Sequence, residues 1–131
     1  MRLTAAICAG LGLASTVVFG DSFPVVGTTY QLDRTQFPGK VAICKTEQAM
    51  VKYWGAKTAK DTATAQKMLV TVETAEDYRR WAKAREGCTL ISSFSQATIN
   101  KVGKGFHRAT FAAWGSEPMW APAAYFGRPV K

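Results

Sequence analysis

The sequence predicts an α+β domain in which a helical segment precedes a strand-rich segment. Apolar residues recur at helical spacing between residues 46 and 86, and short β-like segments separated by glycine turns follow residue 88. Two cysteines, Cys44 and Cys88, lie at the boundaries of the helical segment. Helices and strands that are segregated along a chain are typical of the α+β class.

Residues 1–20 are expected to be a signal peptide. One positive charge at Arg2 precedes an apolar run from Leu3 to Phe19, which ends in small residues. The run is shorter than the about 20 apolar residues that span a membrane, and no basic stop follows it. We therefore expect an exported protein, periplasmic or secreted, with no transmembrane segment in the mature chain; a retained anchor is the alternative.

The remaining residues are expected to form one domain. Residues 21–39 contain glycine, proline and a turn motif, which indicate an irregular N-terminal lead-in. The domain then covers residues 40–131, mainly helical over 40–87 and mainly β over 88–126. Its length suits a single domain, and a hydrophobic fraction of 47% with four tryptophans indicates a packed globule.

Three helices are predicted between the two cysteines. Thr46 is a candidate N-cap for the first helix, which is expected to end near Gly55. Asp61 can cap a second, short helix. Thr74 begins a capping-box pattern for the third helix, which Gly87 closes just before the second cysteine.

Short strands are predicted on both sides of the helices. Residues 40–44 form a brief apolar segment before them, and residues 89–91 resume the β-like pattern afterwards. Two further candidates, 97–102 and 106–112, are joined by Gly-Lys-Gly at 103–105, which is a hairpin signal.

The cysteine pair predicts one structural disulfide, Cys44–Cys88. In an oxidising compartment two cysteines have one intramolecular pairing, and closing a loop of about 45 residues stabilises a fold by about 4 kcal/mol on the chain-entropy model. A redox-active pair and a metal site are the alternatives. Redox pairs usually stand two residues apart, and zinc needs more ligands than these cysteines and one histidine supply.

This layout resembles small exported bacterial proteins whose C-terminal half looks like an SH3-type barrel. The resemblance covers roughly residues 40–126 and is carried by Val41-Ala42-Ile43-Cys44, by the helices up to Gly87-Cys88, and by Met119-Trp120-Ala121-Pro122. The chain departs from the pattern where Ser92-Ser93 replaces a Pro-Gly turn and where no glycine precedes Trp120. The resemblance implies a small antiparallel SH3-like barrel, and such domains often bind cell-wall peptides or protein partners.

Catalytic machinery is not expected. His107 is the one histidine, it has a cationic neighbour, and no carboxylate is near it in sequence. A surface or half-buried strand histidine is therefore expected rather than a general base. The sequence lacks a phosphate-binding loop, a zinc-protease motif and clustered metal ligands, so no cofactor or metal is expected.

Positive charge is the feature with the clearest bearing on function. The chain has 17 basic and 9 acidic residues. Two basic groups stand out, Arg79, Arg80, Lys83 and Arg85 on the third helix and Lys101, Lys104 and Arg108 around the hairpin. Such surfaces attract anionic partners, here an envelope component or an acidic protein. Nucleic acid is not expected outside the cell, and a merely solvated helix face is the alternative.

Aromatic residues supply a candidate ligand site. Tyr53, Trp54, Tyr78 and Trp81 recur at helical spacing and are expected in the core. Trp114 lies at a predicted turn, where a large apolar ring is hard to bury. SH3-like barrels commonly bind ligands in an aromatic-lined groove, so the resemblance implies a groove made by Trp114 and Trp120, with Lys101, Lys104 and Arg108 at its rim. Rings that plug the end of the barrel are the alternative.

These features predict a small exported binding module without catalytic activity that recognises an envelope or wall component or an acidic protein partner. An inhibitor of a secreted or envelope enzyme is the first alternative, acting through a rigid loop at residues 92–96 or 113–117. A cell-wall-acting hydrolase is the second.

Overall fold

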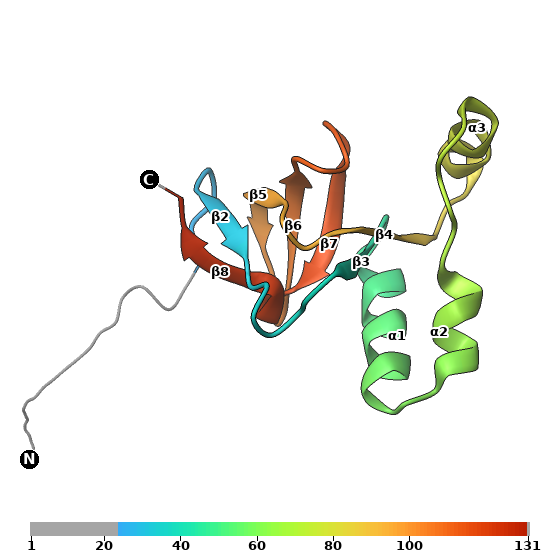
Figure 1. Ribbon diagram of the computed structural model, residues 1–131, viewed down its shortest axis with the longest axis horizontal. Helices are drawn as coiled ribbons and strands as arrows, with labels where there is room; N and C mark the ends of the chain where they lie inside the picture. Colours follow the sequence, from blue (N-terminus) through green and yellow to red (C-terminus); the bar gives the residue numbers. More distant parts are fainter. Residues whose placement is uncertain (1–23, 131) are drawn as a thin grey trace, which may run out of the picture.

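The computed structural model describes residues 24–130, and the predicted signal peptide, residues 1–20, lies outside this range. The described helices are α1 (Glu47–Thr58), α2 (Thr62–Met68), α3 (Ala75–Lys83) and the short 3-10 helix η3 (Ala123–Tyr125). The strands are β2 (Thr29–Leu32), β3 (Lys40–Cys44), β4 (Cys88–Ser92), β5 (Gln96–Val102), β6 (Phe106–Phe111), β7 (Pro118–Pro122) and β8 (Phe126–Pro129). Figure 1 shows a curved sheet, with α1 and α2 beside β3 and with α3 set apart from them.

The seven strands form one antiparallel sheet in the order β4-β3-β7-β6-β5-β2-β8. The α+β class is therefore confirmed. The end strands β4 and β8 are not paired with each other in the described part of the chain, so the sheet is not closed. The predicted SH3-like barrel is not confirmed and stays a prediction.

Strands β2 and β8 are not predicted from the sequence. Strand β2 lies within the lead-in of residues 21–39, where Tyr30 and Leu32 are buried and pair with β5 and β8. A four-residue alternation beside several turn residues resembles a loop, and only its partners, far along the chain, make it a strand. The sheet thus receives strands from both sides of the helical segment.

Alternation along the strands gives the sheet two apolar layers. On β6, His107, Ala109 and Phe111 are buried on one face, which we call the inner face, and the intervening residues are half-exposed on the outer face. The inner face carries the main core, which includes Ile43, Ile91, Ile99 and Met119. Helices α1 and α2 cover part of the outer face, where Ala42, Met50, Tyr53 and Ala65 form a second cluster with the two cysteines.

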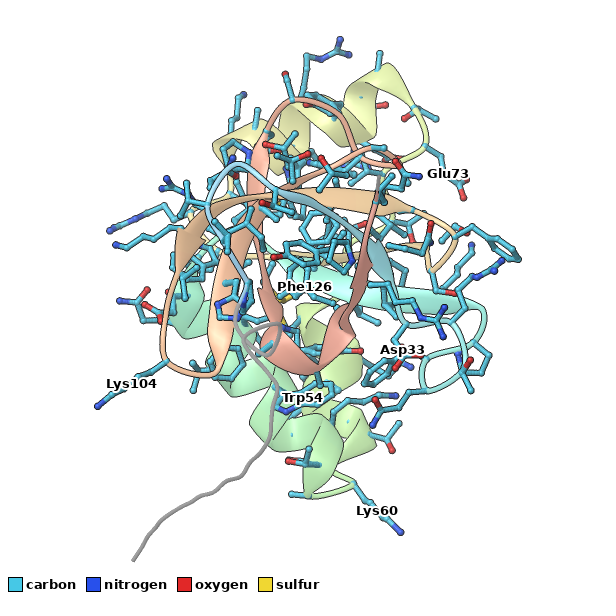
Figure 2. All side chains as sticks on the ribbon, turned by 90° about the vertical axis from the view of Figure 1, so that its left-hand side faces the viewer. Asp33, Trp54, Lys60, Glu73, Lys104 and Phe126 are labelled. Atoms are coloured by element: carbon cyan, nitrogen blue, oxygen red, sulfur yellow. A yellow bond between two sulfur atoms is a disulfide. The ribbon has the colours of Figure 1, made fainter. Side chains whose placement is uncertain are left out.

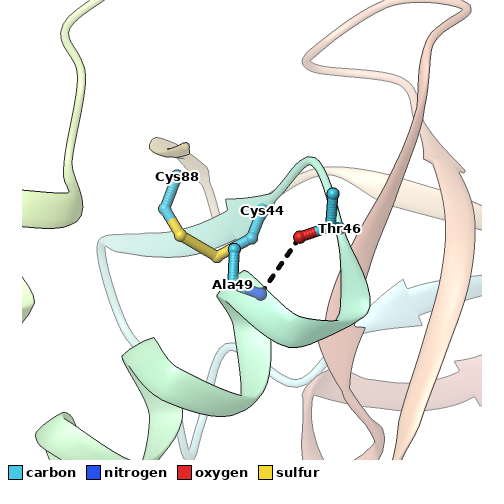
Figure 3. The surroundings of a disulfide bond; sticks show 4 residues. All are labelled: Cys44, Thr46, Ala49 and Cys88. Carbon is cyan, nitrogen blue, oxygen red and sulfur yellow. Dashed lines mark hydrogen bonds between the residues drawn. A yellow bond between two sulfur atoms is a disulfide. The ribbon is translucent and has the colours of Figure 1, made fainter. Parts of the chain in front are cut away.

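The helix starts follow the predicted caps. Thr46 accepts a hydrogen bond from the Ala49 N–H at 3.1 Å (Figure 3), and Asp61 and Thr74 cap α2 and α3. The predicted end of the first helix at Gly55 is wrong, because α1 continues to Thr58. A glycine inside a helix costs only about 1 kcal/mol relative to alanine, and the residues after it are good helix formers.

The predicted disulfide is confirmed. Cys44 and Cys88 are bonded at 2.02 Å and face each other across β3 and β4, with their Cα atoms 4.0 Å apart. The Lys45 N–H donates to the Gly87 carbonyl at 2.9 Å and extends the pairing by one step. Helix α1 begins immediately afterwards (Figure 3), so the bond joins the start of the helical segment to its end.

Candidate functional site

Trp114 belongs to an aromatic cluster that is closed by its own hydrogen bonds. Its ring stacks on Tyr78 with centroids 6.1 Å apart and meets Trp81 edge-on at 5.2 Å. One carboxylate oxygen of Glu117 accepts both indole N–H groups, from Trp81 at 3.1 Å and from Trp114 at 3.0 Å. This closed cluster (Tyr78, Trp81, Trp114) joins α3 to the turn between β6 and β7.

Trp120 lies in the outer layer, apart from the closed cluster, and the structure groups it with two of the three predicted basic residues. Trp120 pairs with Cys44 on one side and with Arg108 on the other, and Arg108 faces Lys101 on β5. The Arg108 Nε is buried and has no hydrogen-bond partner, and Arg108 forms no ion pair, among residues 24–130. Lys104 projects from the hairpin (Figure 2). The predicted basic residues therefore accompany Trp120 but not Trp114.

Basic residues near α3 have structural partners. Arg80 forms an ion pair with Glu76 at 3.6 Å within the helix. Lys45, which the sequence does not single out, donates from Nζ to the carbonyls of Trp81 at 2.7 Å and Ala84 at 2.6 Å. A lysine that bonds the last carbonyls of a helix stabilises its C-terminus. Part of the basic surplus thus holds α3 in place.

His107 is more buried than the sequence suggests, because the alternation of β6 turns it to the inner face. Its side chain is 4% exposed, and Nδ1 accepts the Gly103 N–H at 3.2 Å. Burial beside Phe126 lowers the pKa of His107 below its ordinary value of 6.5. No carboxylate of the described residues is hydrogen-bonded to it, so the geometry gives no support for a catalytic dyad.

A second aromatic group opens onto a surface cleft. Tyr125 of η3 meets Phe37 at 4.9 Å and Trp54 of α1 at 5.8 Å between ring centroids, both edge-on, and Phe37 and Trp54 are 6.1 Å apart. The three rings line a cleft of about 380 Å³ between α1, α2 and the strands β3 and β4. Figure 2 shows Trp54 on α1 at the end of the sheet. We call this the open cleft (Phe37, Trp54, Tyr125).

A hydrogen-bonded loop positions Phe37. The Asp33 carbonyl accepts the Phe37 N–H at 2.9 Å, and Asp33 Oδ1 accepts the N–H groups of Thr35 and Gln36 at 3.1 and 3.2 Å. The Asp33 N–H in turn donates to the Tyr125 carbonyl at 2.8 Å. An aspartate that holds its own turn in this way is a common loop device. Backbone hydrogen bonds thus hold Phe37 and Tyr125 together, in addition to the direct contact between their rings.

The open cleft has a positive rim. Lys40 at the start of β3 and Lys57 in the last turn of α1 line it and are exposed, and none of its lining residues is acidic. Burial raises the pKa of Tyr125 and of Tyr53 above the ordinary value of 10, so both phenols stay neutral. An apolar floor with two cations at its edge suits an anion that also carries an apolar group.

The sequence gives no local signal for the open cleft. Phe37, Trp54 and Tyr125 are brought together from three distant segments, and the spacing of Trp54 in its helix predicts a core residue. That prediction is confirmed for Tyr53, which is buried, and for Trp81, which is 1% exposed. It is wrong for Tyr78, which is 49% exposed because Trp81 is the one residue that α3 buries. Trp54 is half-buried and packs against both layers.

Comparisons with protein-family models, with curated proteins and with solved structures find no match to this chain. Within residues 24–130, no helix combines the length and the apolar character needed to cross a membrane. The same residues bring together no group of three or more His, Cys, Asp or Glu side chains suited to a metal ion. The functional argument therefore depends on the geometry of the cleft.

Proposed function

We propose that the protein is a small exported binding module without catalytic activity that recognises an acidic segment of a protein partner. The observation that carries this proposal is the open cleft, whose aromatic floor is rimmed by Lys40 and Lys57 and by no carboxylate. The rings can cover an apolar group of the ligand, while the lysines attract a neighbouring carboxylate. A ligand that carries both would gain from both contacts.

Export and the finer fold belong to the same proposal. A buried disulfide persists in an oxidising compartment, which agrees with the expected signal peptide and with a periplasmic or secreted location. The antiparallel sheet, with its apolar inner face, is compatible with an SH3-type barrel that opens at β4 and β8. An anionic envelope or wall component is the competing ligand.

The test uses phenylacetate, which combines an aromatic ring with one carboxylate, and follows the backbone amide signals during a titration. We expect shifts around the open cleft and affinity weakened roughly twofold to thirtyfold in the double variant Lys40→Gln, Lys57→Gln, since exposed ion pairs contribute about 0.2–1 kcal/mol each. The matched control is Lys101→Gln, Lys104→Gln, which removes the same charge from two exposed lysines of the hairpin segment.

Benzyl alcohol, which lacks the carboxylate, should bind wild type and both variants alike. Equal loss of phenylacetate affinity in the two double variants would show a general charge effect and would contradict the proposal. Tighter binding of a wall polymer than of an acidic peptide, with the same dependence on Lys40 and Lys57, would assign the cleft to the competing ligand.

One observation favours the inhibitor alternative. Phe94, at the tip of the β4–β5 turn, is 69% exposed, while the turn beneath it is held by the Ser93 N–H on the Gly39 carbonyl at 2.9 Å. The Arg34 guanidinium lies over the Phe94 ring, 4.3 Å from its centroid. A rigid turn with an exposed aromatic tip can enter an enzyme cleft. Inhibition of hydrolases in an envelope extract by wild type, but not by Phe94→Ala, would support this function, and no inhibition by either would exclude it.

A further inference from the structure

Strand β4 forms one edge of the sheet and has backbone groups that no neighbour uses. The Cys88 carbonyl points away from β3, because it accepts the Val70 N–H at 2.7 Å. In an antiparallel strand the N–H and C=O of one residue point to the same side, and this side recurs every second residue. The N–H and C=O of Leu90 therefore point outward as well. Neither has a hydrogen-bond partner within residues 24–130.

A slot runs along this free edge. The segment from Val70 to Glu73 stays beside β4 but bonds it only at Cys88, and together with Leu90 and Trp114 it encloses a cavity of about 520 Å³. The slot continues into the open cleft, since Lys40, Leu69 and Leu90 line both. The Leu90 side chain is 44% exposed at the junction. One continuous groove thus combines an unpaired strand edge with an aromatic, lysine-rimmed end.

We infer that the partner segment binds in an extended conformation as an additional strand on β4, with an acidic residue in the open cleft. This inference rests on the proposed function and specifies how the partner is held. An exposed edge strand is a template for a further strand: main-chain hydrogen bonds supply affinity, and pockets for alternate side chains supply specificity. Leu90 would exchange hydrogen bonds with the peptide backbone, and its side chain would be covered.

The charges along the groove indicate which ligand it binds. Lys40 and Lys57 stand at the aromatic end, whereas the slot adds one acidic lining residue, Glu73, to the Lys40 that it shares with the open cleft. An acidic side chain of the ligand therefore belongs in the open cleft, and an uncharged extended backbone belongs along β4. A second copy of this chain fits poorly, because 17 basic residues against 9 acidic ones make two copies repel each other.

The experiment uses hexapeptides selected from a random displayed library on the intact protein. The peptide with the greatest enrichment is synthesised unmodified and in two N-methylated versions, each methylated at one alternating set of amides. Because only one set faces β4, one version should bind roughly fivefold to tenfold more weakly and the other should bind like the parent. Amide exchange of Leu90 should slow when the unmodified peptide binds.

The protein variants are Leu90→Pro, which removes the outward N–H without removing a ladder bond to β3, and Leu90→Ala, which keeps it. We expect Leu90→Pro to weaken peptide binding more than Leu90→Ala does. The two variants should bind phenylacetate alike, because both lose the Leu90 side chain from the lining of the open cleft. Should Leu90→Pro fail to fold, the methylated peptides and Leu90 exchange decide the question in wild type.

Equal binding of both methylated peptides with unchanged Leu90 exchange would overturn strand addition, and so would a library that yields no enriched peptide. In either case, phenylacetate binding that still depends on Lys40 and Lys57 would leave the proposed function intact. Loss of that dependence would refute the proposed function instead. Concentration-dependent dimerisation that protects Leu90 would assign the edge to a second copy and also overturn the peptide assignment.

Discussion

The two aromatic groups that adjoin β4 have similar residues and different surroundings. In the closed cluster Trp81 is 1% exposed, and both indole N–H groups bond one carboxylate oxygen of Glu117. In the open cleft the rings of Phe37, Trp54 and Tyr125 meet edge-on beside exposed lysines and no acid. The carboxylate completes the first group and leaves it little to offer a ligand. The second lacks such a partner and remains available.

This contrast shows why aromatic content alone does not locate a binding site. Trp114, a tryptophan at a turn, is half-buried, packs against Tyr78 and Trp81 of α3, and donates its indole N–H to Glu117. Trp54 has ordinary helical spacing, yet one side of it faces a cleft because a loop and a 3-10 helix meet it there. The residues around each ring determine whether it is used in packing or is available to a ligand.

The largest effect is expected from a substitution that disrupts the closed cluster. Trp81→Ala removes a fully buried ring and should lower the free energy of unfolding by about 3–5 kcal/mol. Trp54→Ala removes a half-buried ring and should cost less than half as much. Urea unfolding of both variants measures the difference. Equal losses would mean that the two groups contribute alike to the fold.

The second-largest effect is expected from reduction of the disulfide, which tests whether the closed cluster and the open cleft depend on this bond to the same extent. Loss of the Cys44–Cys88 bond should cost about 2–4 kcal/mol. Helix α1, which carries Trp54, begins just after Cys44, whereas α3 is also held by Lys45 and Trp81. Hydrogen exchange with and without reductant should therefore accelerate in α1 and α2 before β5 and β6. Uniform acceleration across the sheet and helices would contradict this order.

A smaller effect is expected from substitutions that remove the carboxylate of Glu117. Glu117→Ala leaves the indole N–H groups of Trp81 and Trp114 without their acceptor and should cost about 1–3 kcal/mol. Glu117→Gln keeps an acceptor oxygen and should cost less, which makes it the matched control. Thermal unfolding of the two variants gives the comparison. An equal loss in both variants would mean that charge, rather than the shared acceptor, holds the cluster.

The smallest effect concerns Tyr125 in the open cleft. Burial raises the pKa of its phenol above the ordinary value of 10, so the folded state keeps its proton where the unfolded state releases it. The resulting stability is complete below pH 10 and is lost as the pH rises above it. Tyr125→Phe should flatten this alkaline decline in the free energy of unfolding. An unchanged pH profile would indicate a solvated phenol.

Local patterns predicted much of the fold. Thr46, Asp61 and Thr74 cap the predicted helices, because a side chain that caps its own helix needs only nearby residues. Outside the predicted signal peptide, Cys44 and Cys88 have one pairing available, so their bond could be predicted from the expectation of export. Strand β2 and the open cleft depend on contacts between distant segments, which no local spacing encodes. The resemblance to SH3-type barrels joined Trp114 and Trp120 in one predicted groove, whereas the structure packs them in different clusters.

The central claim is that ligands enter the open cleft, and the four indole N–H signals test it most directly. Titration with phenylacetate should shift the signal of Trp54 and leave those of Trp81 and Trp114 unchanged. Trp120, in the outer layer, should also stay unchanged. Shifts at Trp114 or Trp120 with a constant Trp54 signal would contradict the account and restore the groove that the sequence predicts.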